Sequence, residues 1–428
     1  MGSNDNIRSI VLSDFPKMKS QKDLVCLLNK VLFEIIKGQG IDANDFHSSI
    51  TERTINYYKN VKVSGNSRYR TFTIKKKSGK LRTISAPVKT LKTIQTCLNE
   101  VFQVFYEPTD NAFGFVPQRC IADGAKRHVN KKYVYNIDLK DFFDTIELYR
   151  VKAILANPPI RMIDQKDNGQ ILPYIIASLC CHPKEVTRFD KDGNAKTYIR
   201  SVLPQGAPTS PILTNMVCRN LDRSLNLLAK KYQAVYTRYA DDITFSSERN
   251  IFKEDSNFIS EMRKIIETEQ GFKINDEKTR LRSDKYRQEV TGLVVNERVN
   301  VTKRFVKQIR MWLYMWETYG YDKAYGYFLH DYMADKGHVK HNTAKMENVI
   351  SGKLEYLKMV VGKDNSMFQK LNQRFEKLMS QDDTTEATPL SVKEEEKKDA
   401  DKVAPHSNEI IPDEISLVDL LKTLIDKI

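Results

Sequence analysis

The sequence predicts an α+β fold that combines many helices with a small sheet. Residues 133–139 and 235–247 are short apolar runs rich in β-branched and aromatic residues, as is typical of strands inside a sheet. Residues 20–37 carry apolar side chains at helical spacing, and residues 303–377 form a longer helical pattern that is basic and aromatic. Residues 381–409 are polar, charged and without periodicity, which predicts a disordered stretch.

The N-terminal part is predicted to begin with a helix and to continue with a hairpin. The helix at 20–37 carries seven apolar residues on one side: Leu24, Leu27, Leu28, Val31, Leu32, Ile35 and Ile36. Residues 69–87 are predicted to form a β-hairpin, because two β-rich runs flank the sequence Lys77-Ser78-Gly79-Lys80 and Pro87 ends the second run. A helix at 91–105 is expected to follow.

The middle of the chain is predicted to alternate between helices and strands. Residues 152–200 are expected to be mostly helical and then to form a hairpin with an Asp-Gly turn. A helix at 212–231 precedes the strands at 235–247, and another helix is expected at roughly 251–269.

Charge is distributed unevenly along the chain. The whole chain carries +14 with a pI near 9.2, whereas residues 381–428 contain six Lys and thirteen Asp or Glu and carry −7. Residues 1–380 therefore carry +21. A body this basic favours a polyanionic partner such as a nucleic acid, because neutralisation of phosphates drives such binding. A protein that merely has a high pI is the alternative.

The cysteines and the first residues indicate a cytoplasmic protein. The six cysteines form no CxxC pair and no zinc-binding spacing, which is typical of a reducing compartment. The first ten residues, MGSNDNIRSI, lack the apolar core of a signal peptide, and no apolar run is long enough to span a bilayer. We therefore expect no membrane partner.

The C-terminal segment 410–428 is predicted to be a short amphipathic helix, because its Leu and Ile residues recur on one side. A helix of this length is marginal alone. We therefore expect it to dock either on the body of the protein or on a partner, at the end of a disordered acidic linker that spans residues 379–409.

Adjacent aspartates, Asp241 and Asp242, lie between strand-forming runs in the sequence TRYADDITFSS. Asp at a hairpin tip is often only a turn former, but neighbouring carboxylates repel each other unless a cation neutralises them. Asp138 lies in an apolar strand within YNIDLKDFFDTI, where an unpaired charge is unfavourable, although it is also placed to cap the next helix. Together these aspartates predict a site for two Mg²⁺ ions and the phosphates that such ions bind.

The segment SVLPQGAPTSPILTN, residues 201–215, is predicted to form a rigid turn that leads into a helix, because its prolines surround Gly206. Gln205 in this turn is placed to pack on an incoming base or sugar. An ordinary proline-rich loop is the alternative interpretation of this segment taken alone.

The order of these segments resembles the reverse transcriptases over roughly residues 20–375. A basic hairpin, IDLKDFF, LPQGAPTSP, YADD and INDEKT follow one another as in that family. The resemblance implies a right-hand polymerase with fingers, a palm built on an antiparallel sheet, and a helical thumb. The implied divisions are the N-terminal helices with fingers (1–132), the palm with an inserted fingers segment at about 152–205 (133–290), the thumb (291–378), the linker (379–409) and the terminal helix (410–428).

The resemblance also implies roles for the residues that match the family's motifs. Asp138, Asp241 and Asp242 would bind the two Mg²⁺ ions, assisted by the Leu139 carbonyl. Phe143 would be the steric gate that excludes a ribose 2′-hydroxyl and so selects dNTPs. The implied nucleotide-binding residues are Lys75, Arg82, Asp141, Phe142, Phe143, Gln205 and Lys278.

Within this group the implied contacts differ. Asp141 and Phe142 would donate backbone N–H groups to the triphosphate. Arg82 would grip phosphates together with Lys75 or Lys80 of the basic hairpin, and a solvated turn is the alternative for each lysine. Lys278 would act as a general acid toward pyrophosphate, and an exposed lysine beside a helix is an equal interpretation.

Further stretches resemble the retron family of reverse transcriptases. Residues 290–292 match its Val-Thr-Gly element, and residues 124–128 match its Asn-Ala-x-x-His element with Gly124 in the Asn position. In the thumb, cations alternate with aromatic rings, and Trp312 and Trp316 are expected in its core. The implied RNA- and primer-binding residues are His128, Tyr239, Thr291, Gly292, Arg304, Lys307 and Arg310.

A retron enzyme is implied to bind its own structured non-coding RNA and to prime from a guanosine 2′-hydroxyl in it. It would copy part of that RNA, from dNTPs, into branched multicopy single-stranded DNA in the bacterial cytoplasm. Anti-phage defence, with an effector protein encoded nearby, is the implied role. We further hypothesise that the acidic tail holds this effector or shields the basic channel. The alternatives are another defence-associated or intron-derived reverse transcriptase with different priming, an RNA-binding antitoxin scaffold, and an RNA polymerase or nucleotide cyclase with a similar palm.

Overall fold

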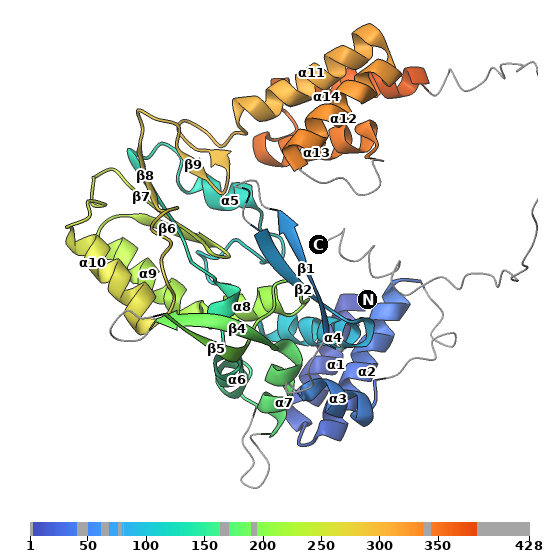
Figure 1. Cartoon of the computed structure of the whole chain (residues 1–428), viewed down its shortest axis with the longest axis vertical. Helices are drawn as coiled ribbons and strands as arrows, with labels where there is room; N and C mark the ends of the chain where they lie inside the picture. Colours follow the sequence, from blue (N-terminus) through green and yellow to red (C-terminus); the bar gives the residue numbers. More distant parts are fainter. Residues whose placement is uncertain are drawn as a thin grey trace, which may run out of the picture. The chain divides into compact units, whose positions relative to one another are not determined.

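The computed structural model describes residues 3–40, 50–60, 68–75, 79, 81–162, 171–189, 195–336 and 344–382 (Figure 1). The linker was predicted to begin at residue 379, but residues 379–382 belong to the helix Ser366–Asp382. The rest of the predicted linker, the predicted terminal helix and Lys80 lie outside the described residues. The described elements mix helices with antiparallel β-structure, so the predicted α+β class is confirmed. No helix among the described residues is long and apolar enough to cross a bilayer.

Helices make up the N-terminal region, as the sequence predicts. Helix α2 (Gln21–Gly38) begins where Ser20 and Asp23 cap its first turn reciprocally, and its apolar stripe is buried. It packs against α1 (Ser3–Asp14) and α4 (Lys89–Phe105), and α3 (Glu52–Lys59) packs against α2 as well.

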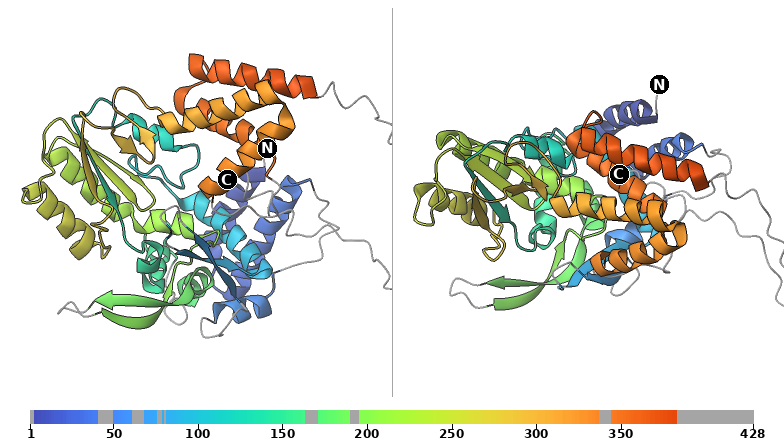
Figure 2. Two further views of the ribbon diagram at one scale, coloured as in Figure 1. Left: turned by 45° about the horizontal axis from the view of Figure 1, so that its top comes forward. Right: turned by 90° about the horizontal axis from the view of Figure 1, so that it is seen from above.

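Two separate hairpins flank the central part of the chain. The predicted basic hairpin is formed by β1 (Tyr69–Lys75) and β2 (Leu81–Pro87). The second hairpin, predicted from its Asp-Gly turn, is formed by β4 (His182–Phe189) and β5 (Ala195–Val202), and Figure 2 shows it as a long two-stranded ribbon.

The main sheet has four antiparallel strands in the order β6-β7-β3-β8. Its central strands are β3 (Tyr133–Asp138) and β7 (Asp242–Ser247), and β6 (Val235–Tyr239) and β8 (Arg280–Ser283) form the edges. The two apolar runs that predicted buried strands therefore meet as neighbours in one sheet.

The two faces of this sheet have different chemistry. One face carries Tyr236 and Phe245, whose rings lie 5.1 Å apart, and Phe258 of α10 packs on Phe245 at another 5.1 Å. Helices α9 (Arg219–Lys231) and α10 (Asn257–Arg263) cover that face (Figure 1). Because side chains alternate along a strand, the opposite face carries polar residues, and Asp138 and Asp242 share it.

Two of the predicted helices have different limits in the structure. The stretch 212–231 is divided at Cys218 into α8 (Ser210–Val217) and α9. The helix expected from residue 251 begins only at α10, because the side chain of Ser256 caps its first turn, and it continues as a π-helical turn at Lys264–Glu269. Local periodicity did not reveal either boundary.

Shorter elements complete the part of the chain up to residue 300. Helices α6 (Leu148–Ala156) and α7 (Ile171–Cys180) account for the predicted helical stretch after residue 152. The remaining elements are α5 (Ile121–Lys126), the 3₁₀ turn Phe143–Thr145, β9 (Glu289–Val290) and β10 (Leu293–Val294).

The C-terminal region of the described chain is helical, as expected. It consists of α11 (Lys303–Tyr319), α12 (Tyr321–Lys336), α13 (Met346–Val361) and α14 (Ser366–Asp382). Trp312 is fully buried and packs edge-on against Phe328 at 4.9 Å, and Trp316 is also buried. Both tryptophans therefore belong to the core of this region, which is the interpretation that the sequence favoured.

Candidate active site

A tight hairpin turn carries the adjacent aspartates. Tyr239 at the end of β6 pairs with Asp242 at the start of β7, so Ala240 and Asp241 alone connect the strands. Ala240 has a φ of +56°, a left-handed conformation that is uncommon for a residue other than glycine.

The same turn lies beside the end of β3. Asp138 and Asp242 are directly paired across the two central strands. The backbone N–H of Leu139 donates to the Asp241 carbonyl at 3.0 Å, which ties the two segments together. The structure therefore brings Asp138, Asp241 and Asp242 to one end of the sheet, as predicted, and places the buried Leu139 beside them.

The electrostatics of this cluster are those of crowded carboxylates. Desolvation by the surrounding protein, together with the charges of Asp241 and Asp138, raises the pKa of Asp242 to about 7, although part of the residue is exposed at the surface. Burial and the charge of Asp138 also raise the pKa of Asp241. Lys278 and Arg82 act in the opposite direction on Asp241. The cluster therefore lacks enough positive charge of its own.

Asp138 is held by neighbouring polar groups. Its carboxylate accepts from Lys278 Nζ at 2.7 Å and from Asn275 Nδ2 at 2.9 Å. Lys278, predicted as a general acid, thus forms an ion pair with a cluster carboxylate. Asn275 was missed by sequence reasoning, although INDEKT was recognised as a motif.

The donor set of the cluster fits a divalent cation. Three carboxylates offer hard oxygen ligands, and a cation between them would relieve the repulsion that raises the pKa values of Asp241 and Asp242. Among the described residues, no three acidic, His or Cys side chains already converge in coordination geometry. A cation at this position would therefore require these carboxylates to turn toward it.

The loop after β3 presents the predicted gate residue. Asp141 is exposed and has a φ of +48°, and its carbonyl accepts from the Thr145 N–H at 3.1 Å. Phe142 is buried against Phe272, with ring centroids 5.5 Å apart. Phe143 is half-buried and lies edge-on to Phe142. The strained residue Asp141 therefore lies directly before two adjacent rings, one buried and one partly exposed, in the loop that follows Asp138.

The proline-rich loop packs against the basic hairpin. The Ser85 N–H of β2 donates to the Gln205 carbonyl at 2.8 Å. Gly206 has a φ of +123°, and a Cβ there would lie 2.9 Å from Ile84 and 3.1 Å from the Ser85 carbonyl. Only glycine fits this close approach. The half-buried Gln205 is thereby fixed beside the strand that carries Arg82.

The predicted cations of this hairpin are placed differently. Arg82 is exposed on β2, and the charge of its guanidinium lowers the pKa of Asp241. The Arg82 guanidinium therefore lies within the electrostatic range of the cluster. Lys75 ends β1 opposite Leu81, but its side chain lies outside what the structure describes.

His128 requires a correction. We predicted an RNA contact, but its ring is fully buried and lies 2.7 Å from both Ser246 Oγ and Thr237 Oγ1. Both ring nitrogens are therefore engaged by the polar face of the main sheet. His128 locks α5 onto that sheet and does not reach a nucleic acid in this arrangement.

Burial of His128 predicts a pH-dependent stability. Burial lowers the pKa of His128 to about 3, whereas an unfolded histidine titrates near 6.5. The unfolded state therefore binds the proton more readily, and the folded state loses stability as the pH falls below 6.5. We expect a loss of about 1.4 kcal/mol from this residue between pH 8 and pH 5.5. Urea unfolding at both pH values measures it.

The control for this prediction is His128→Gln, which cannot titrate. The variant should show a smaller loss of stability between the two pH values. His182, whose pKa burial lowers to about 4, is present in both proteins and cancels in the comparison. Equal losses in the wild type and the variant would contradict the prediction.

The segment Asn111–Phe115 packs against the aspartate turn, which is the turn at Ala240 and Asp241 between β6 and β7. The sequence analysis made little use of this segment. The backbone N–H of Arg238 in β6 donates to the Asn111 carbonyl at 2.8 Å, and the backbone N–H of Phe113 donates to the Arg238 carbonyl at 2.9 Å. A Cβ on Gly114 would lie only 2.6 Å from the backbone nitrogen of Ala240. The glycine within NAFGF was the available signal for this close approach.

We expect Gly114→Ala to be strongly disruptive. The new methyl group would meet backbone, which cannot rotate away, and such overpacking costs about 1–3 kcal/mol. It should therefore lower the thermal unfolding temperature and displace the turn. Gly352→Ala in α13 is the matched control, because a Cβ there has open space and alanine favours a helix. Equal stability of the two variants would contradict the prediction.

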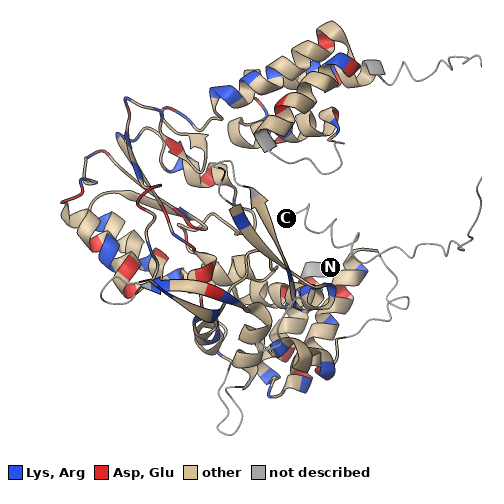
Figure 3. Cartoon of the chain, viewed as in Figure 1, with Lys and Arg blue, Asp and Glu red and all other residues tan. Residues whose placement is uncertain are grey.

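The remaining predicted residues lie at the surface. Thr291 and Gly292 form a turn between β9 and β10 with φ values of +49° and +82°. Tyr239 is half-buried, with its ring 6.4 Å from that of Phe115. Arg304, Lys307 and Arg310 are exposed on α11, where Figure 3 shows basic residues along the helix.

Comparison with known proteins identifies the class. The family model described as reverse transcriptase (RNA-dependent DNA polymerase) matches residues 74–301, more than half of the chain, so the chain belongs to this family. That family generally uses divalent metal ions, which agrees with the donor set of the aspartate cluster.

The relatives specify the type. The chain is 32% identical over 259 residues to the retron Mx65 reverse transcriptase of Myxococcus xanthus, covering 58% of this chain and 55% of that protein. It is 28% identical to the retron Ec86 reverse transcriptase of Escherichia coli over 274 residues, 62% of this chain and 76% of that protein. The chain is therefore of the retron type, and it spans about half the length of the Myxococcus relative.

A solved structure of apo telomerase from Candida tropicalis is also similar. Its TM-score is 0.43 at 12% identity, over 75% of this chain and 60% of that chain.

Proposed function

We propose that the protein is an RNA-directed DNA polymerase that copies part of a cognate structured RNA into DNA. The observation that carries this proposal is the aspartate cluster: Asp138, Asp241 and Asp242 meet at the end of the sheet, within the electrostatic range of Arg82. In this reading, residues 1–132 supply N-terminal helices and fingers, residues 133–290 the palm and residues 291–378 the thumb.

The proposed chemistry is transfer of a nucleotide to a primer hydroxyl. Two bound Mg²⁺ ions would neutralise charge on the attacking and leaving oxygens of the in-line displacement. Asp138, Asp241 and Asp242, with the Leu139 carbonyl, would hold such ions through their oxygens. Lys278, which donates to Asp138 in this structure, would be the general acid that donates a proton to pyrophosphate.

The substrate is positioned by groups around the cluster. Arg82, with Lys75, binds the triphosphate, and the backbone N–H groups of Asp141 and Phe142 contact it from the loop after β3. Gln205 lines the nucleotide pocket, where the Gly206 contact with β2 fixes it. Tyr239 packs against the primer terminus from the face that carries Asp242.

The RNA partner is proposed from the retron type and the basic surface. The turn at Thr291 and Gly292 and the exposed cations Arg304, Lys307 and Arg310 contact the RNA, with exposed rings such as Tyr314 of α11 available for stacking on unpaired bases. Priming from an RNA 2′-hydroxyl gives branched single-stranded DNA in the bacterial cytoplasm. Anti-phage defence, with an effector protein encoded nearby, is the proposed role.

The direct test is to express the gene with its flanking DNA, purify the protein and sequence the nucleic acid that accompanies it. Samples are compared before and after treatment with ribonuclease and with debranching enzyme. DNA joined to RNA by a 2′–5′ linkage is the expected result and identifies the template. Unbranched DNA made on an RNA template would support the polymerase activity but contradict priming from an RNA 2′-hydroxyl. A protein that extends no primed RNA would contradict both proposals.

A further inference from the structure

A buried ion pair lies directly behind the aspartate turn. Arg238 of β6 and Asp222 of α9 are both about 1% exposed. Arg238 Nε donates to Asp222 Oδ1 at 2.7 Å, and Nη2 donates to Oδ2 at 2.8 Å. This is a bidentate pair of the kind that only the planar guanidinium forms.

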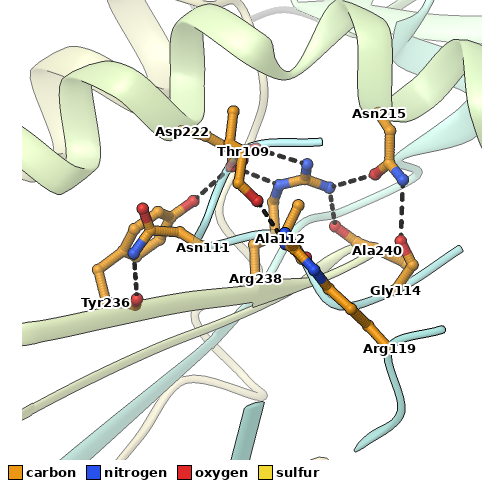
Figure 4. A network of polar contacts seen from close by, with 10 residues as sticks. All are labelled: Thr109, Asn111, Ala112, Gly114, Arg119, Asn215, Asp222, Tyr236, Arg238 and Ala240. Carbon is orange, nitrogen blue, oxygen red and sulfur yellow. Dashed lines mark hydrogen bonds and ion pairs between the residues drawn. The ribbon is translucent and has the colours of Figure 1, made fainter. Parts of the chain in front are cut away.

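The third nitrogen of Arg238 reaches the turn itself. Nη1 donates to the Ala240 carbonyl at 3.2 Å and to Asn215 Oδ1 at 3.1 Å. Asn215 Nδ2 in turn donates to the Gly114 carbonyl at 2.8 Å. Figure 4 shows Arg238 at the centre of this network, between Asp222, Asn215 and the turn. The Arg238 side chain thus connects helix α9, helix α8 and the residue before Asp241, and Asn215 extends the network to Gly114.

The other side of the ion pair is equally constrained. Asp222 accepts from Tyr236 Oη at 2.8 Å and from Thr109 Oγ1 at 2.9 Å, so both of its oxygens have additional donors. Arg119 Nη1 donates to the Thr109 carbonyl and to the Ala112 carbonyl, which fixes the segment that contacts β6. The guanidinium of Arg238 therefore has little freedom to move away from Ala240.

The turn needs such support. Ala240 keeps a left-handed backbone at a φ of +56°, which costs roughly 1 kcal/mol or more for a residue with a Cβ. Such a conformation persists only where the surroundings hold it. The Arg238 bond to the Ala240 carbonyl and the contact of Gly114 with the Ala240 nitrogen hold it from two sides.

We propose that Arg238, anchored by Asp222 and Asn215, is a positioning residue that holds Ala240 in the left-handed conformation and so sets the Asp241 carboxylate against Asp138. This inference rests on the proposed polymerase function for its kinetic consequence. Its consequence for cation binding at the three aspartates stands without that function.

The test is Arg238→Lys, which keeps the charge beside Asp222 but cannot reach both carboxylate oxygens, Asn215 and Ala240 together. In the folded protein we expect kcat for primer extension to fall about 10- to 100-fold, because small misplacements of catalytic groups have effects of this size. The KM for dNTP should change by less than about threefold, since the substrate contacts remain. Binding of Mn²⁺, titrated by electron paramagnetic resonance of the free ion, should weaken about tenfold.

A second substitution separates positioning from folding. Glycine adopts a positive φ without strain, so Ala240→Gly added to Arg238→Lys should recover kcat and Mn²⁺ affinity by at least about fivefold relative to the single variant. A network that served stability alone would give no such recovery. If Arg238→Lys does not fold, Asn215→Ala takes its place, because it removes one anchor of Arg238 and the bond to Gly114.

The matched control is Arg68→Lys. Arg68 is also buried and donates to the Ser178 carbonyl at 2.6 Å and to the Cys181 carbonyl at 3.2 Å, far along the chain from the aspartate turn. It should lower the unfolding temperature and leave kcat and Mn²⁺ affinity of the folded protein unchanged. An equal loss in both arginine variants would overturn the proposal.

The outcomes also separate this inference from the proposed function. Wild-type protein that extends primers, with Arg238→Lys equal to it in kcat and Mn²⁺ affinity, would overturn the positioning role alone. Wild-type protein that binds Mn²⁺ but makes no DNA would reject the polymerase, and weaker Mn²⁺ binding by Arg238→Lys would still support the positioning role. If adding Ala240→Gly to Arg238→Lys recovers neither kcat nor Mn²⁺ affinity, the positioning role of Arg238 is overturned.

Discussion

Asp241→Asn should abolish DNA synthesis, with a loss of about a thousandfold or more. The change removes one negative charge from a cluster in which the charge of Asp138 raises the pKa of Asp241 and the charges of Asp241 and Asp138 raise the pKa of Asp242, so the affinity for a divalent cation falls. Stabilisation of the transition-state charge by bound ions is worth several kcal/mol, which corresponds to a rate change of this size. Primer extension on an RNA template, with magnesium titrated, measures it.

The fold and RNA binding should survive this substitution. Asn is nearly isosteric with Asp, and its amide cannot repel the neighbouring carboxylates, so the unfolding temperature should stay the same or rise. Asp284→Asn is the matched control, because Asp284 is exposed next to β8 and lies outside the cluster. Synthesis retained by Asp241→Asn, or lost equally in Asp284→Asn, would overturn the proposed metal site.

Phe143→Ala should weaken discrimination between dNTPs and rNTPs by about 10- to 200-fold, the range that a steric contact in a pocket supplies. The Phe143 ring is half-buried, edge-on to Phe142 in the loop that follows Asp138. Removal of the ring leaves room for a ribose 2′-hydroxyl, so kcat/KM for rNTPs should rise while that for dNTPs falls only modestly. Single-nucleotide extension with each substrate gives the ratio.

An exposed aromatic ring outside this loop serves as the control. Tyr149 on α6 is 65% exposed, and Tyr149→Ala should leave the ratio unchanged. If Phe143→Ala leaves rNTP incorporation at the wild-type level, Phe143 is not the gate.

The sequence by itself determined the local elements and the identities of the cluster residues. Helix α2 follows from the spacing of its apolar residues, and β3 and β7 follow from short apolar runs. These signals are local, because helix and strand periodicities act over a few residues. The acidic pair and Asp138 were also visible, since charge inside an apolar strand is unfavourable without a partner.

Only the tertiary structure decided how these elements meet. The pairing of Asp138 with Asp242, the burial of His128 between Ser246 and Thr237, and the Asn275 contact with Asp138 join residues more than 100 positions apart. The Arg238 network also depends on such contacts, because its partners come from separate helices and a loop. Hydrogen bonds and close approaches between distant segments follow from packing in three dimensions. A one-dimensional pattern does not contain them, and they are what positions the aspartates against one another.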